Sequence, residues 1–241
     1  MLKDYFKHLY CKSQIDFFNE VSRALDAQEK MFVVTANPET MMMGEAQPAF
    51  DAVLCKEDVV IIPDGIGVVW AAKSLGLESH GRLPGVELAE YLIEYASKTR
   101  KSLFLYGAQE ESITALVKKI QMDHPDVVIA GYRNGYDYSD DEVFQEILTL
   151  QPDIVMVALG IPRQELLIDR WYHRFHKGVF VGVGGTFDVL SGTKRRAPKF
   201  FRSLNMEWLY RILREPKRLG RFYRSNIQFL RRGRKMKKKE V

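Results

Sequence analysis

The stretch DVVIIPDGIGVVW, residues Asp58–Trp70, indicates the fold class. It opens with Val59–Ile62, an apolar β-branched run that is too short for a buried helix and is typical of a strand buried on both faces. Pro63 has no N–H to donate and ends that strand. Asp64 then lies on a glycine-bent turn before a helical pattern begins at Val68, at the edge where open α/β sheets bind ligands. Capping of that helix explains Asp64 equally well.

Strand and helix patterns alternate about six times along the chain. The predicted strands are the apolar runs at 31–35, 59–62, 102–108, 127–131, 153–160 and 178–185. The predicted helices are the segments at 14–28, 40–55, 86–98, 110–122 and 142–150, with further helices opening near 68 and 163. This βαβ spacing predicts a Rossmann-like α/β domain over residues 1–193, with a mostly parallel sheet and helices on both faces.

The charge of the chain is divided between an acidic body and a basic tail. Residues 194–241 hold 18 Lys and Arg against three acidic residues, a net charge of +15, whereas residues 1–193 carry −10. We therefore expect a helical, basic C-terminal appendage over residues 194–241 that meets something anionic. Phospholipid, a lipid diphosphate and nucleic acid are the candidates.

Size and composition set further bounds. The 241 residues, 46% of them hydrophobic, suffice for one sizeable core with an appendage. No run of about 18 apolar residues and no secretory signal is evident, so we expect a cytoplasmic protein without a membrane-spanning helix. Cys11 and Cys55 form no CxxC pair and are expected to be reduced thiols.

Right-handed crossovers should bring the carboxyl ends of all strands to one edge of the sheet. The residues that we expect to share a cleft there are Thr35, Asn37, Asp64, Gly107, Gln164 and Asp188. Each alone is weak evidence, and helix capping accounts equally well for Thr35 and Asn37. Tyr136, in a glycine- and aromatic-rich loop, could stack a base. Arg82, in the loop Gly81–Gly85, could hold a phosphate or simply be solvated.

The motifs of several other chemistries are missing from the sequence. It has no GxGxxG after the first strand, no GxxxxGK[ST], no Asp-x-Asp pair and no GxSxG turn. Its histidines show no metal-ligand spacing apart from His173-x-x-His176, which lies in a polar, surface-like segment. What remains suits a group transfer without metal or cofactor, in which Asp64 is the general base and backbone N–H groups and arginines hold the leaving phosphates.

Six longer segments carry a resemblance to a known family. They are TANPE (35–39), PDGIGVVWA (63–71), GIPRQE (160–165), GVGGTFDVLSG (182–192), KRRAPKF (194–200) and EWLYRILREPKRLGR (207–221). Together they resemble, in the right order and over essentially the whole chain, the WecG/TagA/CpsF family, glycosyltransferase family 26. Members that resemble this sequence build bacterial surface polymers at the cytoplasmic face of the membrane.

The resemblance implies an activity and its partners. The best-known reaction of the family moves N-acetylmannosamine from UDP to the 4-hydroxyl of N-acetylglucosamine on undecaprenyl diphosphate, with inversion, in the wall teichoic acid linkage unit. Other members use UDP-N-acetylmannosaminuronic acid or UDP-glucose, so the donor stays open. We thus expect a UDP-sugar, the lipid-linked acceptor and an anionic membrane surface as partners, and no nucleic acid. Apolar faces of the tail or body could also pair two copies of the chain.

The resemblance also implies roles for individual residues. It places the base on Asp64, with Thr35 and Asn37 beside it. The substrate-binding candidates are Arg82, Gln164 and Asp188, from the resemblance, together with Gly107, Tyr136 and Gly185 at strand ends or loops. Glu87 stands where many relatives have aspartate, which is either neutral or the mark of a subgroup with another donor or acceptor.

The tail has the pattern of interfacial helices. Apolar residues recur at helical spacing in 200–214 and again in 219–230, with arginines beside them, as in helices that lie on a membrane. Family analogy adds that the appendage closes over the active site. The residues expected to hold the diphosphate are Arg211, Arg218 and Arg221. A solvated charge run with a core-packing stripe is the alternative, and we expect disorder over residues 231–239.

Two other classes of protein fit part of the sequence. A nucleic-acid-binding module with a Rossmann-like body would explain the basic tail, but not the acidic body or the polar strand ends. A nucleotide-binding scaffold without catalysis would keep the cleft and would not need Asp64.

Overall fold

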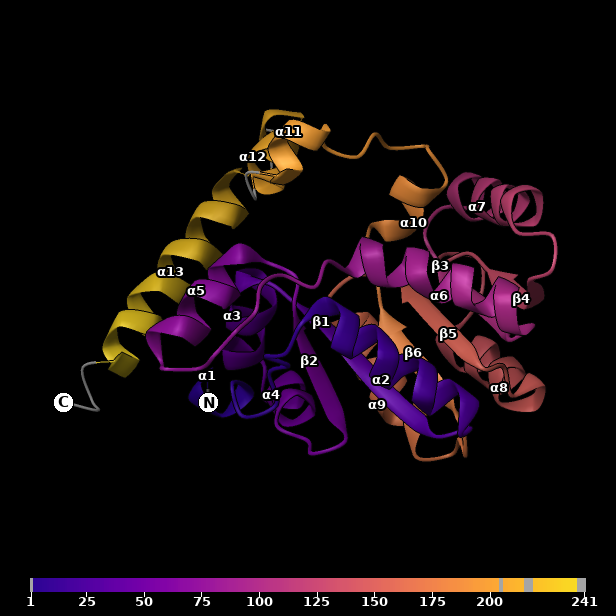
Figure 1. The fold of residues 1–241 in the computed structure, drawn as a ribbon, viewed down its shortest axis with the longest axis horizontal. Helices are drawn as coiled ribbons and strands as arrows, with labels where there is room; N and C mark the ends of the chain where they lie inside the picture. Colours follow the sequence, from indigo (N-terminus) through magenta and orange to yellow (C-terminus); the bar gives the residue numbers. More distant parts are fainter. Residues whose placement is uncertain (1, 204–205, 215–218, 238–241) are drawn as a thin grey trace.

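A six-stranded parallel sheet forms the centre of the computed structural model (Figure 1). The structure describes residues 2–203, 206–214 and 219–237, apart from the side chains of Arg202, Arg211, Arg221, Phe222 and residues 234–237. The strands are β1 (Lys30–Ala36), β2 (Val59–Pro63), β3 (Ser102–Gly107), β4 (Val128–Arg133), β5 (Ile154–Ala158) and β6 (Gly178–Gly182). Their order is β2-β1-β6-β5-β3-β4. All six predicted strands are present, and the predicted fold class is confirmed.

Burial explains why these apolar runs pair in parallel. Every residue of β5 and β6 is buried, as in a sheet covered on both faces. β1 lies between β2 and β6, and Thr35 is in register with Ile62. Pro63 is the last residue of β2, which is an edge strand and therefore tolerates the missing N–H.

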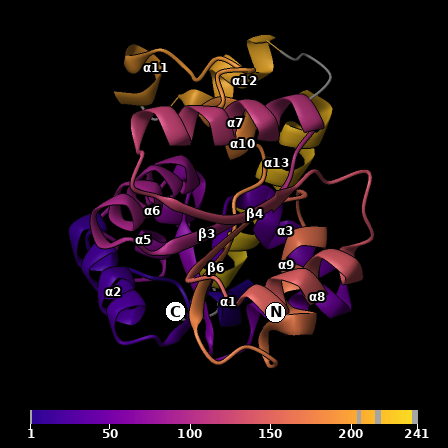
Figure 2. The same cartoon turned by 90° about the vertical axis from the view of Figure 1, so that its right-hand side faces the viewer.

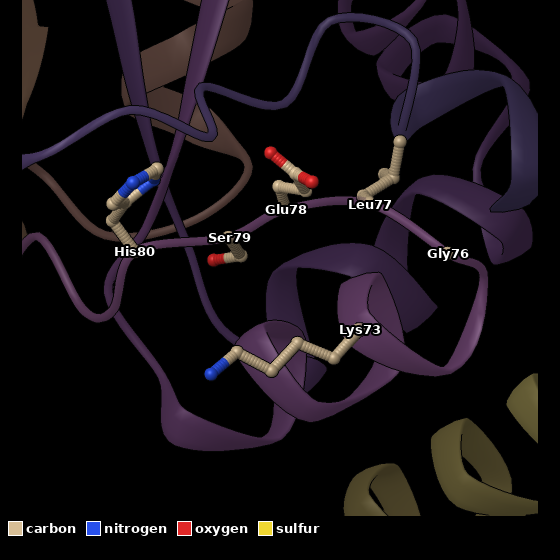
Figure 3. A pocket seen from close by; sticks show the side chains of 6 residues that line it. All are labelled: Lys73, Gly76, Leu77, Glu78, Ser79 and His80. Atoms are coloured by element: carbon tan, nitrogen blue, oxygen red, sulfur yellow. The ribbon is translucent and has the colours of Figure 1, made fainter.

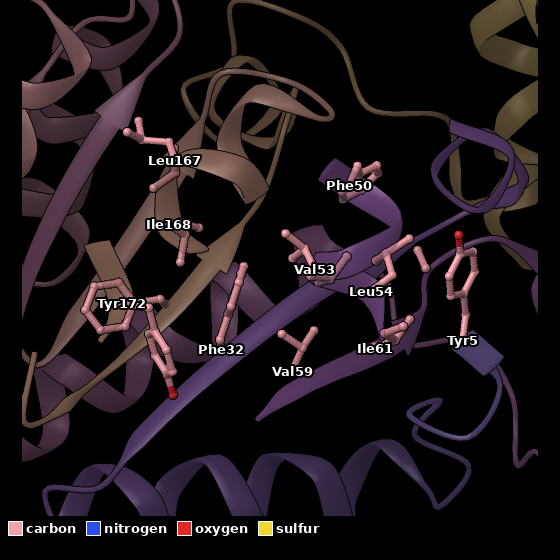
Figure 4. Close-up of a cluster of buried hydrophobic side chains, with 14 of the residues drawn as sticks. Tyr5, Phe32, Phe50, Val53, Leu54, Val59, Ile61, Leu167, Ile168 and Tyr172 are labelled. Atoms are coloured by element: carbon pink, nitrogen blue, oxygen red, sulfur yellow. The ribbon is translucent and has the colours of Figure 1, made fainter. Parts of the chain in front are cut away.

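Helices surround the sheet, most of them in two layers. They are α1 (Leu2–Tyr5), α2 (Gln14–Asp26), α3 (Pro38–Ala46), α4 (Pro48–Leu54), α5 (Ile66–Ser74), α6 (Gly85–Thr99), α7 (Glu110–Asp123), α8 (Asp140–Leu150), α9 (Arg163–Tyr172), α10 (Thr186–Leu190), α11 (Lys199–Ser203), α12 (Glu207–Arg214) and α13 (Leu219–Lys237). The first layer, with α1, α3, α4, α5, α8 and α9, buries side chains such as Tyr5, Phe50 and Leu167 (Figure 4). The second, with α2, α6, α7 and α10, buries Phe17 and Leu88. Figure 2 shows the sheet between α2 and α6 on one side and α8 and α9 on the other.

The segment predicted as one helix, 40–55, is two helices. Gln47, between α3 and α4, has extended backbone with φ −128° and ψ 108°. The reason is Pro48, which cannot donate an N–H and disfavours a helical conformation in the residue before it. The sequence patterns also did not indicate α1 and α10, because a helix of four or five residues is too short to show a helical repeat.

The C-terminal helix α13 packs on the body of the protein. It lies along α3 and α5 (Figure 1), and its Phe229, 1% exposed, belongs to the core of the first layer. The expected disorder over residues 231–239 is wrong as far as Lys237, because α13 continues to that residue with Gly233 buried. Lys238 and Lys239 lie outside the described residues. The division into units 1–193 and 194–241 stays a prediction. No helix within the described ranges has the length and apolar character needed to span a bilayer.

Candidate functional site

The carboxyl ends of β1 and β6 form a topological switch point. After β1 the chain turns to α3 in the first layer, and after β6 it turns to α10 in the second layer. Where connections leave neighbouring strands toward opposite faces, α/β proteins have a ligand-binding crevice beyond the strand ends. Thr35, near the end of β1, and Asp64, directly after β2, lie at this edge.

Asp64 is fixed at this edge by backbone hydrogen bonds. Its N–H donates to the carbonyl oxygen of Ala36 at 2.9 Å, and its Oδ1 accepts from the N–H of Gly85 at 3.1 Å. Its side chain is 33% exposed. The capping explanation is wrong for Asp64, because Gly65 is the N-cap of α5 and no side chain caps that helix. The result is an oriented, accessible carboxylate, as a general base requires.

Arg82 connects Asp64 to the C-terminal segment. Its Nε donates to the carbonyl oxygen of Asp64 at 2.6 Å, and its Nη2 lies 3.9 Å from Asp64 Oδ1. The same Nη2 lies 3.8 Å from Oε2 of Glu207, the first residue of α12. Arg82 is therefore not a solvated surface residue. A largely buried guanidinium holds two carboxylates and brings α12 to the edge of the sheet that carries Asp64.

Thr35 and Asn37 have different local roles. Asn37 caps α3, because its Oδ1 accepts from the N–H groups of Glu39 and Thr40 at 2.8 and 3.1 Å. The cap uses the oxygen of Asn37, so its amide nitrogen is the part that could contact a substrate. Thr35 does not cap the helix. Its hydroxyl donates to the carbonyl oxygen of Gly182 at 2.9 Å and so joins the ends of β1 and β6.

Gln164 lies beneath the surface of the site. It is 1% exposed, and its Oε1 accepts from the N–H groups of Gly160 and Gly184 at 3.0 and 3.1 Å. Its Nε2 donates to Oε1 of Glu165 at 2.6 Å. These contacts give Gln164 a structural role in joining the turns after β5 and β6. Its predicted contact with a substrate stays a prediction.

Glu165 is a buried carboxyl that the sequence did not single out. It is 0% exposed, and its Oε2 has no hydrogen-bond partner among the described residues. Burial raises the pKa of Glu165 from the ordinary 4.5 to about 7, and the hydrogen bond from Gln164 opposes part of that rise. The side chain lies at the start of α9 and packs against the end of β6, where a Cβ on Gly182 would lie 2.8 Å from Glu165 Oε1.

Gly107 and Tyr136 lie toward the other side of the sheet. Gly107 has φ +120°, and a Cβ there would lie 2.5 Å from the backbone of Ala158, so the close approach of β3 and β5 requires glycine. Tyr136, 67% exposed, is held by the buried Asn134, whose Oδ1 accepts its N–H at 2.9 Å. Tyr136 follows β4 and Asp64 follows β2, at opposite ends of the sheet. At about 4.8 Å per strand, these strands lie about 24 Å apart, but the loop that carries Tyr136 folds back toward β3, because the N–H of Gly135 donates to the carbonyl oxygen of Ala108 at 3.0 Å. The expectation that the strand-end residues share one cleft stays a prediction.

Gly185 lies in the turn after β6, and Asp188 lies in α10, the short helix that follows it. The Asp188 carboxylate forms an ion pair with Lys194 at 2.6 Å, and its carbonyl oxygen accepts from the Lys194 N–H at 2.8 Å. These bonds close the turn from which the C-terminal segment departs. Gly185 is the N-cap of α10, and a Cβ there would meet nothing within 4 Å, so packing does not explain this glycine.

Three predicted arginines fall outside what the structure describes. Arg218 lies outside the described residues, and so do the side chains of Arg211 and Arg221. Their role stays a prediction. The described part of the chain contains no group of three or more His, Cys, Asp or Glu that could hold a metal ion.

A surface hollow of about 390 Å³ lies away from the strand ends (Figure 3). Its lining consists of Lys73, Gly76, Leu77, Glu78, Ser79 and His80. The backbone N–H of His80 donates to the carbonyl oxygen of Cys11, which belongs to the N-terminal segment that runs along the outer edge of β2. The candidate site is therefore defined by the oriented groups at the carboxyl ends of the strands, and not by this hollow.

A model of the glycosyl transferase WecG/TagA/CpsF family matches residues 8–240. The chain belongs to this family. It is 42% identical to a protein of Bacillus spizizenii, 38% identical to one of Bacillus subtilis and 35% identical to one of Staphylococcus aureus. The matches cover 82% of this chain and 76%, 77% and 78% of those relatives. All three are named N-acetylglucosaminyldiphosphoundecaprenol N-acetyl-beta-D-mannosaminyltransferase.

Sequence reasoning missed two carboxyl groups at the site of this glycosyltransferase. Glu207 is one of only three acidic residues in the basic tail, and that contrast was the available signal. Glu165 ends the GIPRQE segment, directly after a predicted strand, yet its burial is invisible in the local pattern. Glu207 pairs with Arg82, and Glu165 is buried against Gly182; both partners are distant in the chain, so no local periodicity indicates these contacts.

Proposed function

We propose that this protein transfers N-acetylmannosamine from UDP-N-acetylmannosamine to the 4-hydroxyl of N-acetylglucosamine on undecaprenyl diphosphate, forming a β linkage. The observation that carries this proposal is the agreement of relatives that are 35–42% identical over most of the chain and share one named activity. The oriented, accessible carboxylate of Asp64 supports it, because a single inverting displacement needs one base.

The reaction assigns a role to each group at the edge of the sheet. Asp64 takes the proton of the acceptor hydroxyl while that oxygen bonds to the anomeric carbon. The bond from that carbon to UDP breaks at the same time, and the diphosphate leaves with the added negative charge. Arg82, together with Arg211, Arg218 and Arg221 of the appendage, stabilises that charge. Thr35 and the amide of Asn37 contact the sugar.

A panel of donors tests the proposed donor. The full chain is given a short-chain GlcNAc-diphospho-lipid and UDP-N-acetylmannosamine, UDP-N-acetylmannosaminuronic acid or UDP-glucose, with and without EDTA. We expect turnover with UDP-N-acetylmannosamine to exceed the others by about 10- to 100-fold, the discrimination that a few pocket contacts supply. We also expect EDTA to change nothing and proton NMR to show the β anomer. Faster transfer from either other donor would replace the proposed donor, and loss of turnover in EDTA would refute the metal-free reaction.

We also propose that α13 rests on an anionic membrane. Its described side chains divide into three faces. Ser225, Phe229 and Gly233 are buried against the body, whereas Leu219, Tyr223 and Leu230 are exposed on a second face. Exposed Arg224 and Arg231 lie on a third face. An exposed apolar face flanked by arginines is typical of helices that lie in the membrane interface.

Vesicle flotation tests this surface. The variant Arg224→Glu, Arg231→Glu should bind vesicles containing anionic lipid at least about 10-fold less well than the wild type, since each basic residue near such a surface contributes about 1 kcal/mol. The matched control is Lys118→Glu, Lys119→Glu on α7, which changes the net charge equally at exposed positions far from α13 (Figure 1). Equal loss in both variants, or tighter binding of duplex DNA than of vesicles at the same salt concentration, would contradict the proposal.

A further inference from the structure

The buried carboxyl of Glu165 has no part in the transfer described above. An interior carboxyl is costly unless hydrogen bonds compensate for its lost hydration, so a position like this one requires a reason. Glu165 is 0% exposed, and Gln164 Nε2 donates to its Oε1 at 2.6 Å.

The bond to Glu165 sets the orientation of the Gln164 amide. With Nε2 directed to Glu165, the oxygen of Gln164 faces the N–H groups of Gly160 and Gly184 and accepts both. If the amide rotated by half a turn, its NH₂ group would face two N–H donors, and all these hydrogen bonds would be lost. One acceptor atom on Glu165 therefore determines whether Gln164 can join the turns after β5 and β6.

These turns are part of the candidate site. A Cβ on Gly182 would lie 2.4 Å from Gln164 Nε2 and 2.8 Å from Glu165 Oε1, so the pair packs directly against the end of β6. The carbonyl oxygen of Gly182 accepts the hydroxyl of Thr35 at 2.9 Å. A continuous chain of contacts thus runs from Glu165 through Gln164 and Gly182 to Thr35.

We propose that Glu165 is a positioning residue for the sugar transfer: it fixes the Gln164 amide, and through it the strand-end turns that hold Thr35 in its working position. The proposal rests on the proposed function, because it concerns that same site. The property that matters is the hydrogen-bond acceptor of Glu165, and neither its negative charge nor its volume.

Two substitutions separate the acceptor from the volume of the side chain. Glu165→Gln keeps an oxygen acceptor for Gln164 Nε2, whereas Glu165→Met fills similar space without one. We expect Glu165→Gln to keep kcat within about 3-fold of the wild type. We expect Glu165→Met to lower kcat by at least about 10-fold with a smaller change in the donor KM, because misplaced groups act mainly on the chemical step.

The melting temperature distinguishes positioning from simple stability. Replacing a buried polar group by an apolar one of similar shape is often neutral or stabilising. A Glu165→Met protein that melts no lower than Glu165→Gln, yet has lost kcat, supports positioning. Full activity in Glu165→Met overturns the proposal, and so does an equal loss of kcat in Glu165→Gln.

A spectroscopic measurement keeps the test independent of activity. In ¹H–¹⁵N spectra, the Gln164 side-chain amide, assigned through Gln164→Asn, should exchange slowly with water in the wild type and in Glu165→Gln. The same signal should exchange fast in Glu165→Met. If Glu165→Met does not fold, a fast-exchanging Gln164 amide in Glu165→Gln overturns the proposal, and a protected one supports it. A wild type that transfers none of the three donor sugars would refute the proposed function, but the exchange measurements would still show whether Glu165 fixes the Gln164 amide.

Discussion

Replacing Asp64 with asparagine is expected to lower kcat about 10²- to 10⁴-fold, the usual contribution of a general base. The substitution removes the proton acceptor and the negative charge that faces Arg82, but the Oδ1 of asparagine can still accept the N–H of Gly85, now seen at 3.1 Å. The fold of the loop before α6 should therefore persist. Binding of UDP, measured by calorimetry, should stay within a few-fold of the wild type.

The matched control for this variant is Asp58→Asn, since Asp58 is an exposed acid just before the other end of β2. It should keep full turnover. Turnover of Asp64→Asn close to that of Asp58→Asn would remove Asp64 as the base. If the protein were a nucleotide-binding scaffold without catalysis, the wild type and both variants would all form no product.

The unfolding free energy of the wild type should fall relative to that of Glu165→Gln as the pH rises from about 4.5 to about 7. Burial raises the pKa of Glu165 from 4.5 to about 7 in the folded chain. Between these values the folded chain holds a proton that the unfolded chain has lost, so raising the pH favours unfolding. Below about pH 4.5, Glu165 is protonated in both the folded and the unfolded chain. Above about pH 7 it is ionised in both, and the full free-energy cost of burying the charge then lowers the stability of the wild type. The shift corresponds to about 3 kcal/mol.

Urea unfolding of both proteins at a series of pH values measures this difference. Comparison with Glu165→Gln cancels the other titrating groups, since both proteins share them. A difference between the two that stays constant from pH 4.5 to 8 would show that the carboxyl is not buried in the way described. If the unfolding free energy of the wild type instead rose relative to that of Glu165→Gln as the pH rises, the pKa of Glu165 would be lowered in the folded chain.

The strands could be predicted because each is a short apolar run that can be recognised without knowing what packs around it. A strand such as Ile154–Ala158, buried on both faces, needs apolar residues throughout, and turn residues bound it on each side. The helix at 40–55 was misjudged because one proline outweighed a continuous helical pattern. The extent of α13 was misjudged because charge runs were given more weight than the burial of Phe229 and Gly233, which only packing reveals.

The candidate site was predictable in part, for a related reason. Parallel strands place their carboxyl ends at one edge, so Thr35, Asn37 and Asp64 could be named from their position alone. Which of these ends are neighbours depends on the strand order, and that order places β2 and β4 at opposite edges of the sheet.

The local pattern of the chain is sufficient to predict the parallel α/β architecture, the acidic residue after β2 and the basic tail, because each of these features consists of residues that are consecutive in the sequence. The strand order, the approach of Glu207 to Arg82 and the burial of Glu165 under the glycine turns appear only in the folded molecule. They join residues distant in the chain, such as Thr35 and Gly182, and such contacts depend on how the layers pack rather than on any local preference.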